Sequence, residues 1–241
     1  MSLIIPETAH VKLVVALAIS QMLIPAIASD SLTLSGDEVL ARLDAATQRR
    51  HALLTEYSVS RKYTLKNLRF AKQAEVWVVM HYRRAEGQRY TVVSRSGSDK
   101  LNGIIDEVIA SEARASLPPE NARYEISAAN YQVRLLGTEV VLGRRCYVLQ
   151  LAPRIKSKSL IVGKAWIEAD SYGVVRMDGQ FAASVSMLIG APRMAEDFIA
   201  VNGYWLPSRV HAVSPSFLLG SSELDIVFSN YELPPDVAPV Q

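Results

Sequence analysis

The sequence contains few of the residues that build metal sites, disulfides and catalytic centres. Its 241 residues include one cysteine and four histidines. A single cysteine, Cys146, excludes an intramolecular disulfide and a zinc site made of cysteines. The 26 Lys+Arg nearly balance the 24 Asp+Glu, so we expect no general attraction to nucleic acid or anionic lipid. With 49% apolar and 21% charged residues, the chain has the composition of a folded domain rather than a disordered one.

The sequence also lacks the short motifs of common enzymes. It contains no Gly-x-Ser-x-Gly elbow, no phosphate loop and no Gly-x-Gly-x-x-Gly. His51, His81 and His211 are widely spaced, whereas metal sites bring two ligands together at helical or hairpin spacing. Cys146 is expected to be a structural thiol, with a reactive thiol as the alternative. We therefore predict no enzyme activity, no catalytic residue, no metal and no cofactor. A hydrolase is the weakest option, since it needs a histidine and an acid that converge.

An apolar segment near the N-terminus is typical of a secretory signal peptide. Lys12 precedes the continuously apolar residues 13–19, and the small-x-small sequence 26–28 follows. A transmembrane anchor needs about 20 apolar residues, and this segment is shorter and interrupted by Pro25. We predict a cleaved signal peptide over 1–28 and a periplasmic protein. Anchorage in the inner membrane by an uncleaved segment is the alternative.

Two amphipathic helices are expected. The Ser35-x-x-Glu38 spacing is that of a capping box and predicts a helix over 36–52. A second helix begins at Ser98 or Asp99 and ends before Pro118. Its apolar positions recur at helical spacing, and they are Leu101, Ile104, Ile105, Val108 and Ile109.

The rest of the chain alternates between apolar and polar residues, which predicts half-buried antiparallel strands. Short turn signals separate them, the strongest being Asn202-Gly203. Pro207 is expected to place its strand at a sheet edge or at a bulge. A sheet of eight to eleven such strands must curl. We therefore predict an α+β fold, an unclosed antiparallel half-barrel over 29–233 with both helices covering its concave face, followed by a flexible tail over 234–241.

Several segments in a fixed order resemble a known family. They are Gly143–Pro153, Gly163–Asp170, Tyr172–Gly179, Gly203–Ser208 and Glu223–Ile226. Together with the two helices they resemble the LolA-like outer-membrane lipoprotein-sorting proteins. The resemblance implies a soluble periplasmic carrier that shields the acyl chains of lipoproteins, or free lipid, in an apolar cavity. Its partners would be these chains and an acceptor or donor protein of the envelope, with no nucleic acid, and we expect a monomer. The alternative is an envelope sensor or regulatory module of the same fold that binds a protein partner.

The resemblance also suggests which residues act on the ligand. The helix after Ser98 would be a movable lid, although an ordinary core helix has the same pattern. The family's lid-locking arginine has two candidates, Arg61 and Arg69, and neither is favoured. The residues predicted to line the cavity are Tyr90, Val92, Leu101, Ile104, Ile105, Val108, Leu149, Leu151, Ile167, Met177, Phe181, Leu224, Ile226 and Phe228.

Overall fold

The computed structural model describes residues 34–184, 190–216 and 220–234. The predicted signal peptide and nearly all of the predicted tail lie outside these ranges. The helices are α1 (Gly36–Leu53), α2 (Asp99–Ala115) and the short 3₁₀ helix η1 (Glu120–Arg123). The strands are β1 (Glu56–Asn67), β2 (Lys72–Arg83), β3 (Gly87–Gly97), β4 (Tyr131–Val141), β5 (Arg144–Pro153), β6 (Ile161–Glu168), β7 (Val174–Phe181), β8 (Arg193–Val201), β9 (Tyr204–Ser214) and β10 (Ser222–Glu232).

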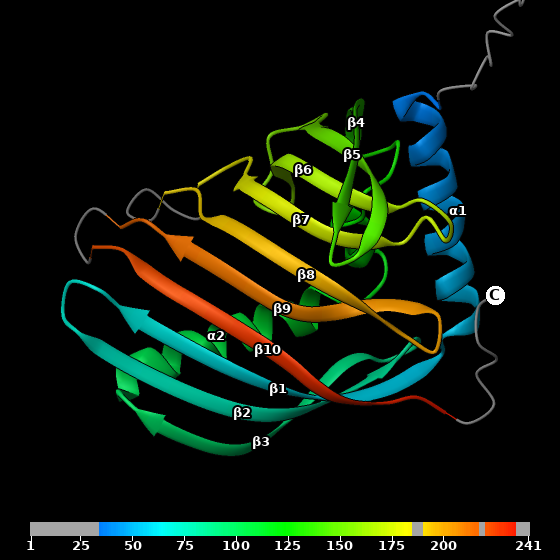
Figure 1. Ribbon diagram of the computed structural model, residues 1–241. Coiled ribbons are helices and arrows are strands. Elements are labelled where there is room, and N and C mark those ends of the chain that lie inside the picture. Colours follow the sequence, from blue (N-terminus) through cyan, green and yellow to red (C-terminus); the bar gives the residue numbers. More distant parts are fainter. Residues whose placement is uncertain (1–33, 185–189, 217–219, 235–241) are drawn as a thin grey trace, which may run out of the picture. The chain divides into compact units, whose positions relative to one another are not determined.

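The ten strands form one antiparallel sheet in the order β3-β2-β1-β10-β9-β8-β7-β6-β5-β4. The edge strands β3 and β4 do not pair with each other, so the sheet is not closed into a barrel. Figure 1 shows the curl of this sheet, with α2 lying across its face behind β1 and β10 and α1 standing beside β5–β8. The predicted α+β half-barrel is therefore confirmed.

Local sequence signals set most of these boundaries. Ser35 and Glu38 exchange both hydrogen bonds of the capping box, and α1 begins at Gly36, as predicted. The hairpin between β8 and β9 turns at Asn202-Gly203, where both residues have positive φ angles of 49° and 81°. These angles suit a tight hairpin turn, in which asparagine and glycine carry little strain.

Pro207 lies in β9, which runs between β8 and β10 in the middle of the sheet. The register shifts beside it, because Phe198 is opposite Pro207 while Asp197 is opposite Arg209. The extra residue, Ser208, donates a hydrogen bond from its hydroxyl to the Asp197 carbonyl at 3.0 Å. The expectation of a bulge is confirmed and that of an edge strand is wrong, since the bulge removes the need for a ladder N–H at the proline.

Two separate apolar clusters hold the helices to the sheet. Leu101 and Ile105 of α2 pack with buried residues of β1, β2 and β10. Val39, Leu40 and Leu43 of α1 pack with buried residues of β4, β5 and β6. Each helix therefore covers its own half of the concave face.

Two details differ from the expected patterns. Ile104 is 47% exposed, because the buried stripe of α2 turns toward Asn102 instead. Val92 is 41% exposed, because β3 is an edge strand and its register with β2 shifts beside Val93. A bulge ends the simple alternation of faces along a strand. Among the described residues, no helix is both long and apolar enough to cross a bilayer.

Candidate functional site

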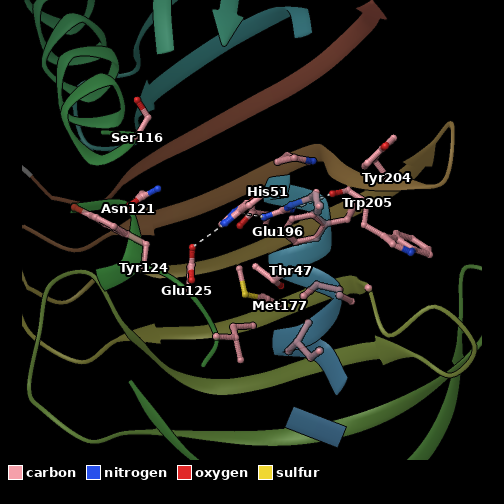
Figure 2. A pocket seen from close by; sticks show the side chains of 18 of the residues that line it. Thr47, His51, Ser116, Asn121, Tyr124, Glu125, Met177, Glu196, Tyr204 and Trp205 are labelled. Atoms are coloured by element: carbon pink, nitrogen blue, oxygen red, sulfur yellow. Dashed lines mark hydrogen bonds and ion pairs between the residues drawn. The ribbon is translucent and has the colours of Figure 1, made fainter. Parts of the chain in front are cut away.

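A cavity of about 510 Å³ lies between the two apolar clusters, and residues of both clusters line it. Side chains of α1, α2, η1, β1, β3 and strands β7–β10 surround it, and Figure 2 shows several of them pointing inward. Its apolar lining includes Leu43, Ala46, Ile126, Val174, Met177, Phe198, Val210 and Phe228. Its ionisable lining includes Arg49, Arg50, His51, Arg61, Glu112, Glu125 and Glu196. The wall of the cavity therefore combines an apolar surface with ionisable side chains of both charges.

A buried arginine connects the sheet to α2 at one side of the cavity. Arg61 of β1 donates from Nη1 to Glu112 Oε2 of α2 at 3.0 Å. The same carboxylate oxygen accepts from the hydroxyls of Tyr63 at 2.7 Å and Tyr90 at 2.9 Å. Arg61 also lies over the ring of Phe228, with its guanidinium carbon 4.8 Å from the ring centre. We call Arg61, Tyr63, Tyr90 and Glu112 the latch.

The protonation states of the latch follow from burial and from neighbouring charge. Burial alone would lower the pKa of Arg61, but Tyr90, Tyr63 and Glu112 outweigh it and raise that pKa above the usual value. Burial, followed by the Glu112 charge, raises the pKa of both tyrosines, so that they stay protonated donors. A charged hydrogen bond of this kind is stronger than a neutral one because water does not screen it well.

A histidine and an acid also meet in the cavity, which the spacing of the histidines did not reveal. His51 Nδ1 lies 3.6 Å from Glu125 Oε1, the contact dashed in Figure 2. Burial lowers the pKa of His51 and raises that of Glu125, so both shifts favour the neutral forms over a charged pair. His51 Nε2 faces Arg50 Nη2 at 3.4 Å. Among the described residues, no serine hydroxyl is hydrogen-bonded to either ring nitrogen, so the nucleophile that a hydrolase needs beside its histidine is not in place.

Glu196 of β8 points into the cavity from the sheet (Figure 2). Its neighbours across the strands are apolar, Met177 on β7 and Val210 on β9. Its side chain makes no hydrogen bond or ion pair within the part of the chain that the structure describes. The carboxyl reaches the open space of the cavity although protein surrounds it, and burial raises its pKa to about 7.

The far wall is built by close packing around Trp205. Its indole Nε1 donates to Ser171 Oγ at 2.9 Å, and Ser171 in turn donates to the Glu168 carboxylate at 2.6 Å. A Cβ placed on Gly173 would lie 1.8 Å from the Trp205 ring. Only glycine at this position lets the indole lie flat against the turn before β7.

The structure brings only two of the predicted lining residues to the cavity, Met177 and Phe228. The remaining predicted residues that are buried or half-buried lie in the two clusters: Tyr90, Leu101, Ile105, Val108, Leu224 and Ile226 under α2, and Leu149, Leu151, Ile167 and Phe181 under α1. Val92 and Ile104 are exposed. Contact of these others with a ligand stays a prediction.

The charged residues of the cavity were missed from sequence, yet a usable signal was present. Arg61 lies in phase with the buried residues Val59, Tyr63 and Leu65. Glu196 likewise shares a face with Phe198. A charged residue at a strand position whose side chain faces the core is a candidate site residue, because burying a charge without a partner is costly.

The remaining candidates behave as structural groups. Cys146 is fully buried, and burial raises the pKa of its thiol, which disfavours the reactive thiolate. His81 and His211 do not line the cavity, and His211 contacts Asp225 at 3.2 Å instead. Within the described ranges, no three His, Cys, Asp and Glu side chains gather as a metal site would require.

No family model matches the sequence, and no curated protein matches it. Solved structures similar to this chain include a DUF1329 family protein from Desulfovibrio piger, 16% identical, covering 83% of this chain and 95% of that one, with a TM-score of 0.41. A LolA superfamily protein from Nitrosomonas europaea is 13% identical, with 86% and 98% covered and a TM-score of 0.42. A domain assigned to outer membrane lipoprotein sorting from Vibrio parahaemolyticus is 12% identical, with 80% and 92% covered and a TM-score of 0.42.

Proposed function

We propose that the protein binds acyl chains of a lipid or lipoprotein in this cavity and carries them in the periplasm without changing them chemically. The observation that supports this most is the cavity itself, because its volume of about 510 Å³ falls in the range of small-ligand sites. Each methylene moved from water into such a site contributes about 0.8 kcal/mol. Ten methylenes would contribute about 8 kcal/mol, against which the cost of association is set.

The latch gives the proposed carrier a way to open. Leu101 and Ile105 of α2 lie on the cluster formed by β1, β2 and β10, and the Arg61–Glu112 pair joins the same helix to β1. If α2 moves away, the cavity gains a wider entrance while the cluster under α1 stays intact. Of the two arginines that the family resemblance suggested as a lock, Arg61 has the required contact with α2.

Periplasmic location rests on the predicted signal peptide over 1–28, which lies outside the described residues. Binding without catalysis is supported by the buried thiol of Cys146, whose pKa is raised by burial, because a nucleophilic cysteine needs an accessible thiolate. It is also supported by His51, which has no hydroxyl or thiol nucleophile hydrogen-bonded to it among the described residues.

The experiment that tests the proposal is native mass spectrometry of the full chain, purified from the periplasm, with analysis of the extracted lipid. Two matched variants of α1 control for the site of binding. Ala46→Trp fills part of the cavity, whereas Ala45→Trp adds the same ring to the exposed side of the helix. We expect bound lipid in the wild type and in Ala45→Trp, and much less in Ala46→Trp.

Two outcomes would overturn the proposal. One is protein free of lipid that also takes up no added amphiphile. The other is equal lipid in both tryptophan variants, since binding would then occur elsewhere. Recovery of a membrane signalling protein with lipid-free protein would instead favour the regulatory module.

A further inference from the structure

The cavity contains charged side chains that the acyl-carrier function does not use, among them Arg50 and Glu196. An apolar chain needs neither Arg50 nor Glu196, yet both line the cavity. Among the described residues, the Arg50 guanidinium makes hydrogen-bond contacts with the Trp205 backbone carbonyl at 3.2 Å and with the His51 ring at 3.4 Å. Guanidinium has five N–H donors, so most of its donors remain available to a ligand.

Glu196 comes to the cavity from β8, whereas Arg50 comes from α1, and the two interact electrostatically. Met177 and Val210 flank its carboxyl on the neighbouring strands, and no described side chain bonds to it. The side chain of Glu196 is half-buried and reaches the open space of the cavity, so its hydrogen-bonding groups are available to a ligand there.

We propose that the cavity is selective for an amphiphile with an anionic headgroup, a carboxylate or a phosphate, held inside by Arg50 and contacted by Glu196. The inference rests on the proposed acyl-binding function and adds the class and the orientation of the ligand. The chain would lie along the apolar wall formed by Val174, Met177 and Phe198, with its head directed inward.

The charges around Glu196 favour an anion over a cation. The positive charges of Arg61 on β1 and Arg50 on α1 lower the pKa of this carboxyl. The negative charges of Glu112 on α2 and Asp197 on β8 raise it. Tyr231 of β10 also interacts with it electrostatically. Arg61 and Glu112 neutralise each other in the latch, and Asp197 is paired with Arg176 at 2.6 Å. Once Glu196 is protonated, it no longer offsets the charge of Arg50, and Glu125, whose pKa burial raises, is the remaining acid that interacts with this guanidinium.

Binding should therefore depend on pH. The pKa of Glu196 is about 7 in the free protein, so the neutral donor form prevails below neutrality and the repulsive carboxylate form above it. If only the protonated form accepts the anion, affinity at pH 8.5 falls by about 30-fold relative to acidic pH, as follows from the fraction still protonated.

The test is isothermal titration calorimetry of the full protein with four probes of one chain length. The probes are dodecanoate, dodecyl phosphate, dodecan-1-ol and dodecylammonium, each titrated at pH 6.0 and pH 8.5. We expect dodecanoate or dodecyl phosphate to bind at least 10-fold more tightly than dodecan-1-ol at pH 6.0, and the ratio between these two anions identifies the headgroup. The preference should shrink at pH 8.5.

Variants assign the effect to the two side chains. Arg50→Met should lose the preference for the anion while still binding dodecan-1-ol. Glu196→Gln should keep the preference and lose its pH dependence. The neighbouring Asp197→Asn, whose carboxylate is held by Arg176, should keep the preference and a pH dependence with a lower midpoint, because the Asp197 charge raises the pKa of Glu196.

The outcomes separate this inference from the function beneath it. Equal binding of dodecanoate, dodecyl phosphate and dodecan-1-ol would overturn the headgroup proposal and leave acyl binding standing. Tighter binding of dodecylammonium, lost in Glu196→Gln, would also overturn it, because Glu196 would then serve as an anion for an amine. Binding of none of the four probes would overturn both.

Discussion

Removal of the Glu112 carboxylate should destabilise the protein much more than removal of an exposed charge on the same helix. In Glu112→Ala, Arg61 keeps its buried charge, with its side chain only 6% exposed, and loses its acidic partner. Breaking a buried ion pair from one side costs about 3–5 kcal/mol. Glu112 is itself 29% exposed, so water partly replaces it, and we expect a loss near the lower end, about 3 kcal/mol.

The assay is urea and thermal unfolding of the mature chain, followed by circular dichroism. A loss of about 3 kcal/mol corresponds to a Tm lower by about 6–12 °C for a domain of this size. The matched control is Asp106→Ala. Asp106 also joins α2 to β3, through Arg95 at 2.7 Å, but both side chains are more than 40% exposed. An exposed pair contributes at most about 1 kcal/mol.

A double-mutant cycle with Arg61→Met isolates the pair itself. The double variant should lose less stability than the sum of the two single variants, since no uncompensated buried charge remains. The reasoning would be refuted if Glu112→Ala cost no more than Asp106→Ala, or if the coupling lay within about 0.5 kcal/mol of zero.

Further predictions concern pH and two glycines. Because the pKa of Glu196 is raised from 4.5 to about 7 on folding, its contribution to stability is full below pH 4.5 and is lost as pH rises through 7. As pH rises, the free energy of unfolding of Glu196→Gln should therefore increase relative to that of the wild type, by up to about 3 kcal/mol. Urea unfolding of both proteins at pH 4.5 and pH 8 measures this difference. A difference that does not change with pH would show that the Glu196 carboxyl has an ordinary pKa. Gly103→Ala on α2, where an added Cβ meets nothing within 4 Å, should stabilise by about 0.5–1 kcal/mol. Gly173→Ala, whose added Cβ collides with Trp205, should destabilise the protein by about 1–3 kcal/mol. Thermal unfolding measures both glycine variants, and a change in stability of the same sign in both would contradict the packing described.

The parts of the fold that the sequence predicts are those decided by near neighbours. The capping box of Ser35 and Glu38 acts over three residues, and the turn at Asn202-Gly203 acts over two. The alternation of apolar and polar residues likewise can be recognised within a single strand, without knowledge of its neighbours in the sheet. The bulge beside Pro207 was expected for the same reason, because a proline removes its own ladder donor wherever it occurs.

The site escaped prediction because its contacts join residues far apart in the chain. Arg61 reaches Glu112 across 51 positions and Tyr90 across 29. The alternation shows that Arg61 is on the buried face, but not which acid meets it there. The same holds for His51 and Glu125, which are neighbours only because η1 and α1 close on one cavity.

The position of the charged residues explains why the cavity stays open. Replacing a buried ion pair with apolar side chains of similar volume is often neutral or stabilising, so stability alone does not account for the latch. If Arg61, Glu112 and Glu196 were leucines, the cluster under α2 would extend to Phe198 and Met177 and join the cluster under α1. The cavity would then close by burial of its own walls. We infer that charged groups, which need water or a ligand, keep the two clusters apart, and this is consistent with the ligand-binding function proposed above.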